Sequence, residues 1–414
     1  MSNPSQPLPA EIVDAIIDLL HDDWQALATC ASMSSAWRSR ALVHLSKSVT
    51  IVSRRPPFAE ALRFMRVFRP GSVLADALTT LVVRGRGRSA DLPYMLDLAH
   101  FRNLRSLSLV GLTVRTINKL RDFLASCPQS IEELCFDRLS LVNIPLAVGG
   151  GDGSRALLQG IRPFPRLRAL RLRLWDDDYG CHAVHYALYE SLIVGAWSSV
   201  LLRTLSVHTF GREWNLPTGA SLVGRMQGTL QDVRVTPWRP VDPDDALMSA
   251  LSRCASLQKL TLCFVPVDDA HRARYPHILE SLATWLTPPR CHFAASLREL
   301  TLMLHYPMEP MIPHARVAQT EGSLLAAFAD VLLPRTYPHL SKLRILLYSD
   351  APDLRLVFGR AALQNPGTAV AVEAPLWEEH VERVMSALRP LEDGGVRVEV
   401  CHASSFMTFL DAIL

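Results

Sequence analysis

The stretch LRSLSL, Leu104–Leu109, carries apolar residues at its first, fourth and sixth positions. Stretches with this apolar spacing occur nine times along the chain of 414 residues. They begin at Leu78, Leu104, Ile131, Leu167, Leu202, Leu230, Leu257, Leu297 and Leu340. One such stretch means little because leucine is common. A series with steps of about 20 to 29 residues, lengthened where insertions occur, predicts stacked structural repeats.

Apolar residues at helical spacing separate several of these stretches. The segments 114–127, 244–256 and 376–391 each place them on one face, as Leu120 and Leu124 do in the first. A short strand followed by a helix, repeated many times, predicts an α/β solenoid with a parallel sheet on its concave side and helices outside. We expect the last strand near residues 394–401.

The position three residues beyond the last apolar residue of each stretch departs from the usual pattern of such repeats. An Asn or Cys normally stands there. Here it is often apolar, as at Leu112 and Leu139. We therefore expect apolar packing in place of the usual row of polar side chains at this position. The same reasoning assigns Trp175, Phe210 and Trp238 to the core rather than to a ligand-stacking row.

The first fifty residues follow a different pattern, which predicts three short helices. Pro9 and Glu11 suit the start of the first helix. Asp22 or Asp23 can cap the second helix, and Ser34 or Ser35 the third. The first helix carries an apolar stripe formed by Ile12, Ile16, Leu19 and Leu20. So small a module cannot cover this much apolar surface, which predicts a protein interface.

Composition indicates a folded intracellular protein. Half of the residues are apolar, and the net charge of +3 is too small to argue for nucleic-acid binding. The eight cysteines lack zinc-site spacing, and neither a secretory signal nor a membrane span is recognisable. We expect reduced thiols, a cytoplasmic or nuclear location, and neither nucleic acid nor a membrane as partner.

Motifs that would support catalysis are weak. Gly85-x-Gly87-x-x-Ala90 resembles a dinucleotide loop but lies within the repeats, and the cluster from Asp176 to His185 reads as a helix start rather than a metal site. We expect no enzyme activity, no cofactor and no metal. Two alternatives stay open: a metal enzyme at Asp176–His185, and RNA binding through arginines such as Arg63, Arg66 and Arg69.

The N-terminal module resembles the F-box of fungal proteins. The resemblance rests on Leu8-Pro9-x-Glu11-Ile12, the turn Leu19–Asp23, the Trp37-Arg38 pair and the stretch His44–Ile51. Ser32, Ser34 and Ser46 depart from the residues usual in the family. With the repeats, the resemblance extends to F-box proteins with leucine-rich repeats. It implies an F-box at residues 1–47 and an irregular leucine-rich-repeat horseshoe at 48–414, with its first clear repeat at 78.

This resemblance implies a non-catalytic substrate receptor of an SCF-type ubiquitin ligase. The F-box would bind a Skp-family adaptor and, through it, a cullin–RING ligase, while the repeats would hold an unknown target protein. The residues expected to form or support the adaptor contact are Leu8, Pro9, Ile12, Ile16, Leu19, Trp24, Leu27 and Trp37. A repeat scaffold that does not engage the ligase is the alternative.

The target surface is expected on the strand positions that lie between the leucines and alternate away from the core. The residues that we single out there are Arg171, Arg173, His208, Arg234 and Arg344. Arginine pairs bidentately with carboxylate and phosphate, so our hypothesis is that this row favours an acidic or phosphorylated segment. A solvated sheet of mixed charge is the alternative, because arginine is frequent throughout the chain.

Overall fold

The computed structural model describes twelve stretches of the chain, and it divides into two compact units. The described residues are 8–53, 59–85, 91–93, 96–141, 164–173, 200–208, 216–235, 246–264, 275–288, 290–305, 314–348 and 381–403. The first unit comprises residues 1–174 and 178–200, and the second comprises 175–177 and 201–414. Each unit is described separately.

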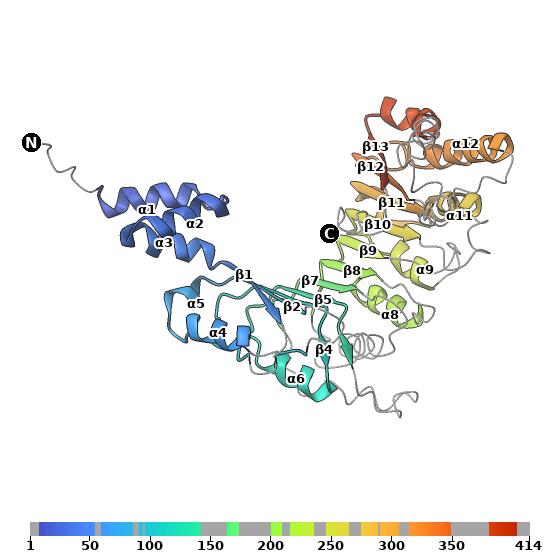
Figure 1. Ribbon diagram of the computed structural model, residues 1–414. Coiled ribbons are helices and arrows are strands. Elements are labelled where there is room, and N and C mark those ends of the chain that lie inside the picture. Colours follow the sequence, from blue (N-terminus) through green and yellow to red (C-terminus); the bar gives the residue numbers. More distant parts are fainter. Residues whose placement is uncertain are drawn as a thin grey trace, which may run out of the picture. The chain divides into compact units, whose positions relative to one another are not determined.

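The chain begins with the three predicted helices, which we call the helical module (residues 8–47; Figure 1). They are α1 (Ala10–Leu19), α2 (Trp24–Met33) and α3 (Ser35–Leu45). Of the alternative caps, the Asp23 carboxylate accepts a hydrogen bond from the Ala26 N–H at 2.9 Å. The Ser34 hydroxyl accepts one from the Trp37 N–H at 3.3 Å. Each cap satisfies an amide that the first turn of a helix leaves unpaired.

Five parallel strands follow in the first unit, ordered as in the chain. They are β1 (Ser48–Ser53), β2 (Thr80–Gly85), β3 (Ser106–Val110), β5 (Glu133–Asp137) and β7 (Ala169–Arg173). Helices α4 (Ala59–Val67) and α5 (Val73–Ala77) connect β1 to β2, and α6 (Ile117–Ala125) lies between β3 and β5. Two short strands, β4 (Thr113–Val114) and β6 (Ser140–Leu141), form a separate parallel pair.

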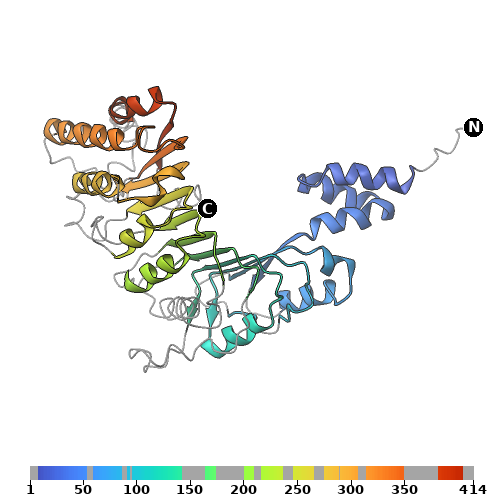
Figure 2. The ribbon, with the colours of Figure 1, turned by 180° about the vertical axis from the view of Figure 1, so that it is seen from behind.

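Six parallel strands form the second unit, again in chain order. They are β8 (Thr204–His208), β9 (Asp232–Val235), β10 (Lys259–Phe264), β11 (Glu299–His305), β12 (Lys342–Tyr348) and β13 (Arg397–Ala403). The connections contain α8 (Leu216–Met226), α9 (Ala246–Ser252), α11 (Tyr275–Leu286), the 3₁₀ turn η2 (His292–Ala295), α12 (His314–Val331) and a helix at 381–393. Both ribbon views place α8, α9, α11 and α12 on one side of the strands (Figures 1 and 2).

The repeated apolar spacing explains this α/β arrangement. All nine predicted stretches end in a strand, and every apolar position of the nine is buried. Strand register aligns equivalent positions, so Leu107 stands between Leu81 and Leu134 in the first unit. In the second unit Leu300 likewise stands between Leu260 and Leu343. Only apolar side chains can form such buried rows without unpaired polar groups.

Hydroxyl and amide side chains link successive stretches at a position that the sequence pattern did not indicate. Ser130, Thr229 and Ser296 each precede the first apolar residue of their stretch, and each donates to the backbone oxygen of the preceding stretch's first leucine, at 2.7 to 2.9 Å. Asn103 and Ser256, at the same position, donate to backbone oxygens two residues further upstream. We call these five residues the polar ladder. As predicted, Leu112 and Leu139 are buried, so apolar side chains occupy the position where Asn or Cys is usual.

Two predicted helices, 114–127 and 244–256, appear as α6 and α9. Leu120, Leu124, Leu247 and Leu251 face the core there, and Leu388 does so in the helix at 381–393. Within the described residues, no helix is both long and apolar enough to cross a membrane. Outside the described residues lie Trp175, Phe210, Trp238, Asp176–His185 and most of the Gly85–Ala90 loop.

Candidate functional site: an exposed apolar helix face and a charged strand face

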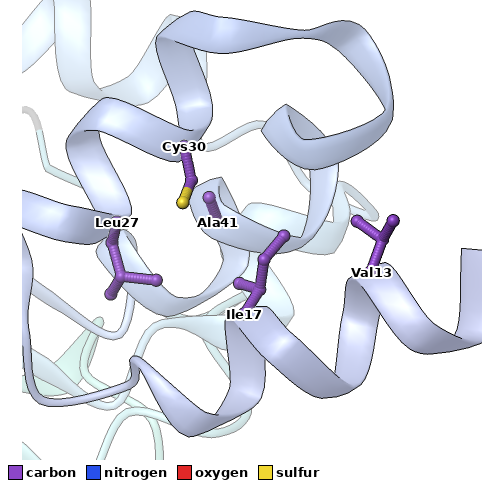
Figure 3. Packing of buried hydrophobic residues seen from close by; sticks show 5 residues of the cluster. All are labelled: Val13, Ile17, Leu27, Cys30 and Ala41. Atoms are coloured by element: carbon purple, nitrogen blue, oxygen red, sulfur yellow. The ribbon is translucent and has the colours of Figure 1, made fainter. Parts of the chain in front are cut away.

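The core of the helical module is small. It consists of Val13, Ile17, Leu27, Cys30 and Ala41, which converge from the three helices (Figure 3). Leu20, Ala31, Trp37 and Leu45 pack around it and remain partly exposed. Two residues of the predicted adaptor contact therefore serve this core: Leu27 is buried within it and Trp37 packs against it.

A second apolar stripe on α1 faces away from this core. Ile12, Ile16 and Leu19 recur at helical spacing, next to the inward stripe of Val13 and Ile17. Ile12 is 49% exposed, Leu19 is 83% exposed, and Ile16 is half-buried.

The exposed apolar surface extends beyond α1. Trp24, at the start of α2, is 63% exposed, and Leu8 and Pro9 are also exposed. Seven of the eight predicted adaptor residues, all except Leu27, are therefore at least partly accessible. Met33 of α2 and Leu42 of α3 are also exposed, and neither was among the predicted residues. The helical period turns Met33 away from the side of α2 on which Leu27 lies.

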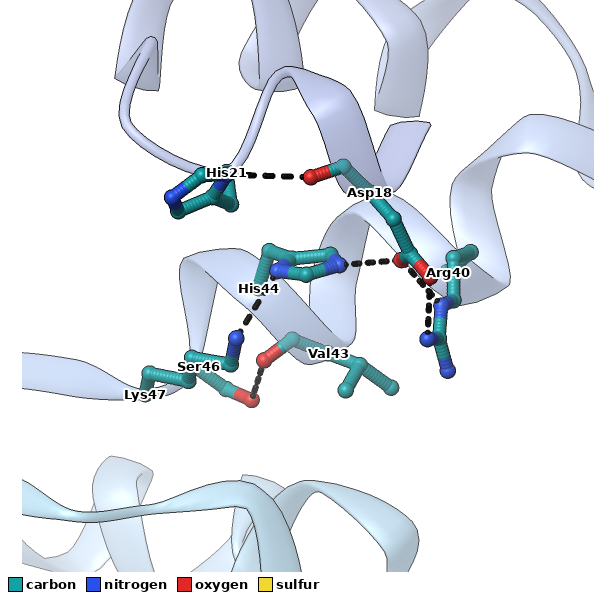
Figure 4. A network of polar contacts seen from close by, with 7 residues as sticks. All are labelled: Asp18, His21, Arg40, Val43, His44, Ser46 and Lys47. Atoms are coloured by element: carbon teal, nitrogen blue, oxygen red, sulfur yellow. Dashed lines mark hydrogen bonds and ion pairs between the residues drawn. The ribbon is translucent and has the colours of Figure 1, made fainter. Parts of the chain in front are cut away.

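A polar clamp joins α1 to α3 beside the small core (Figure 4). Arg40 donates two hydrogen bonds to the Asp18 carboxylate, both at 2.7 Å, and His44 Nε2 lies 2.6 Å from Asp18 Oδ1. Lys47 Nζ lies 3.0 Å from His44 Nδ1, so Nδ1 accepts from the ammonium and Nε2–H donates to the carboxylate. The hydrogen bonds from Arg40, and then from His44, hold the pKa of Asp18 far below its usual range.

We expect Asp18→Asn to destabilise the helical module at neutral pH. A carboxyl group with a lowered pKa stabilises the folded state above its unfolded pKa of about 4, and that contribution disappears as the pH falls toward the lowered value. The melting temperature of the variant should lie below that of wild type at pH 7, and the gap should narrow below about pH 4. A gap that is independent of pH would show that the Asp18 charge does not stabilise the module.

The five residues predicted for target binding are divided between the two units. Arg171 and Arg173 lie on β7 of the first unit; His208, Arg234 and Arg344 lie on β8, β9 and β12 of the second. Arg173 is 3.4 Å from the Asp137 carboxylate. Arg171 has no ion-pair partner among the described residues. The structure therefore does not bring the five together as one described site.

Acidic neighbours offset much of the basic charge in the second unit. Arg234 lies 3.1 Å from Asp232 on its own strand, and Lys259 lies 2.7 Å from Glu299 on the neighbouring strand. These pairs give the described face the mixed charge of the alternative hypothesis.

The exception is Glu399 on β13, where basic residues outnumber the acid. Lys342 at 3.0 Å, Arg397 at 2.9 Å and Arg344 at 3.7 Å surround this one carboxylate. Hydrogen bonding from Lys342 lowers the pKa of Glu399, so the carboxylate is ionised. One negative charge among three positive charges leaves local positive charge at this end of the second unit.

Three strand positions expected to face away from the core are in fact buried. They are Asp137, Ser206 and Thr261. Register places Ser206 and Thr261 on either side of Arg234, whose long side chain can cover shorter neighbours. These positions therefore contribute little accessible surface, because alternation along a strand does not report the length of neighbouring side chains.

Five of the seven described cysteines are buried in the core, and Cys135 and Cys401 are partly exposed. Burial raises the pKa of Cys254 and Cys291 to about 12 and also raises that of Cys127, so these thiols stay protonated at neutral pH and are poor nucleophiles. Among the described residues, no group of His, Cys, Asp and Glu is arranged to hold a metal.

In comparisons with known proteins, neither a family model nor a curated protein matches the chain.

Proposed function

We propose that this protein is a non-catalytic substrate-recognition subunit of an SCF-type E3 ubiquitin ligase. The observation that supports this proposal best is the second apolar stripe of α1, which lies outside the module's own core together with Trp24. Exposed apolar surface of this kind is typical of a protein-binding site. The resemblance of this segment to the F-box identifies the proposed partner as a Skp-family adaptor.

In this proposal the parallel strands and their helices form leucine-rich repeats that hold a target protein. The ligase then gains rate by raising the effective concentration of a target lysine near the ubiquitin-charged conjugating enzyme, without chemistry by this chain. Arg171, which has no ion-pair partner among the described residues, and the positive surroundings of Glu399 keep uncompensated charge on the strand face. We propose them as contacts for an acidic or phosphorylated target segment.

The test is co-purification of the full chain with a Skp-family adaptor. We expect wild type to form a stoichiometric complex. Ile12→Asp with Leu19→Asp should weaken it at least about tenfold, because a buried charge replaces apolar contacts at the centre of the interface. Both side chains are exposed in the free protein, so the variant should still fold.

A matched control places two aspartates elsewhere in the first unit, at the exposed Val67 and Val73. This control should bind the adaptor as wild type does. If folded wild type fails to bind, the receptor proposal is wrong, and a repeat scaffold without ligase engagement becomes the better explanation. Equal loss in both variants would mean that the effect is not specific to α1, which contradicts the proposed interface there.

A further inference from the structure

A groove of about 640 Å³ opens on the first unit beside the turns that precede β3, β5 and β7. Ala99, Cys127 and Pro165 give it apolar walls, and Arg102, Gln129 and Arg166 contribute the longest polar side chains. Among the described residues that line it there is no carboxylate. The groove belongs neither to the helical module nor to the strand positions considered for target binding.

The two arginines of the groove have uncompensated charge. Both side chains are exposed, and neither guanidinium has an ion-pair partner among the described residues. Arg105, three residues after Arg102, differs from both, because its Nε lies 4.0 Å from the Glu132 carboxylate. Guanidinium groups in a groove without acidic residues favour a ligand that brings the negative charge itself.

Arg166 also interrupts the polar ladder. It occupies the position immediately before Leu167, where the equivalent Ser130, Thr229 and Ser296 hydrogen-bond to the preceding stretch. The arginine does not make this bond, so at this stretch a residue that would link neighbouring motifs is replaced by a long cation lining the groove. Ala77, Leu201 and His339 occupy the same position in other stretches and are not part of the ladder either. Of these four residues, only Arg166 lines the groove.

We propose that this groove binds an extended acidic segment of a partner polypeptide. Arg102 and Arg166 lie on the turns before β3 and β7, two strand spacings apart, which is about 10 Å. A single phosphate or carboxylate group is too small to span that distance. A chain in the polyproline II conformation rises about 3.1 Å per residue with three residues per turn, so acidic side chains three apart lie on one face about 9 Å apart. They would meet one arginine each while small apolar residues lie against the alanine and proline walls.

The experiment measures fluorescence anisotropy of a labelled peptide with glutamates three residues apart, separated by alanine and proline, titrated with the full chain. We expect wild type to bind this peptide and not its glutamine counterpart, with affinity falling as salt rises. Arg102→Glu with Arg166→Glu should weaken binding about tenfold, because two attractions become repulsions. The lysine pair at these positions should retain most of the affinity.

The matched control is Arg63→Glu with Arg66→Glu, which makes the same charge change on exposed residues of α4 and should bind as wild type.

Arg166→Ser separates structure from binding: it should restore the ladder hydrogen bond and raise the melting temperature while weakening the peptide complex. A lower melting temperature would assign Arg166 a structural role and contradict the proposal. So would absence of peptide binding, equal loss in the control, competition by inorganic phosphate alone, or binding only to phosphatidylserine vesicles. None of these measurements involves the Skp adaptor, so the proposal can fail or hold independently of the proposed function.

Discussion

Ile17→Ala should unfold the helical module, whereas Ile12→Ala on the same helix should leave it folded. Ile17 is fully buried in a core of five residues, and Ile12 is half-exposed. Removing a buried isoleucine side chain costs about 2 to 5 kcal/mol through lost burial and the cavity left behind. A core of this size supplies only about 3 to 5 kcal/mol, so one such loss can exhaust its stability.

Amide hydrogen exchange on the full chain measures this difference directly. Peptides covering α1, α2 and α3 should lose protection in Ile17→Ala and keep it in Ile12→Ala, because a surface change away from packing contacts alters stability by less than about 0.5 kcal/mol. Peptides from β10 to β12 should be unaffected in both variants and provide the internal control. Equal protection in the two variants would mean that the module's stability does not come from the described core.

The contrast between Ile12 and Ile17 also shows what the sequence could not decide. Ile12, Ile16 and Leu19 form an apolar stripe on α1, and so do Val13, Ile17 and Leu20. Helical period alone identifies both stripes but does not say which one faces α2 and α3. From the sequence we named only the stripe of Ile12, Ile16 and Leu19, together with Leu20, and counted Leu27 among the residues that form or support the adaptor contact. Packing of the three helices instead puts Val13, Ile17 and Leu27 inside.

The strands were predictable for a simple physical reason. A buried row must contain apolar residues in every stretch, so its spacing is repeated in the sequence and can be recognised there. β1 was not among the nine because Ser46 stands where the other stretches have their first apolar residue, although Val49 and Ile51 are in register with Leu81 and Val83. The polar ladder was missed because serine and threonine are common, and nothing in the sequence reports the backbone oxygen that each one meets.

Charge pairing across strands was equally hidden. Lys259 and Glu299 are far apart in the sequence, yet register places them side by side and they form an ion pair. Register itself depends on which stretches become neighbours. The predicted target residues were therefore located correctly on strands, while their electrostatic surroundings required the structure.

Trp285→Ala should produce the largest loss of stability in the second unit. Trp285 of α11 is almost fully buried, its ring centroid lies 5.5 Å from that of Phe293, and its Nε1–H donates to the Met248 backbone oxygen of α9 at 3.0 Å. Truncation of a buried tryptophan to alanine costs about 3 to 5 kcal/mol. The Met248 oxygen loses its indole donor as well, which adds to the cost.

Trp285→Phe separates the two contributions, because it retains an aromatic ring and removes the indole donor. In urea unfolding we expect it to cost about 0.5 to 1.5 kcal/mol, the net contribution of one hydrogen bond, because the Met248 oxygen loses its indole donor. Since the hydrogen bond joins helices of successive strand–helix units, both variants should reduce exchange protection in α9 as well as in α11. That coupling is expected of stacked motifs, whose stability comes from each neighbouring interface. Loss of exchange protection confined to α11 would mean that this hydrogen bond does not couple α9 to α11.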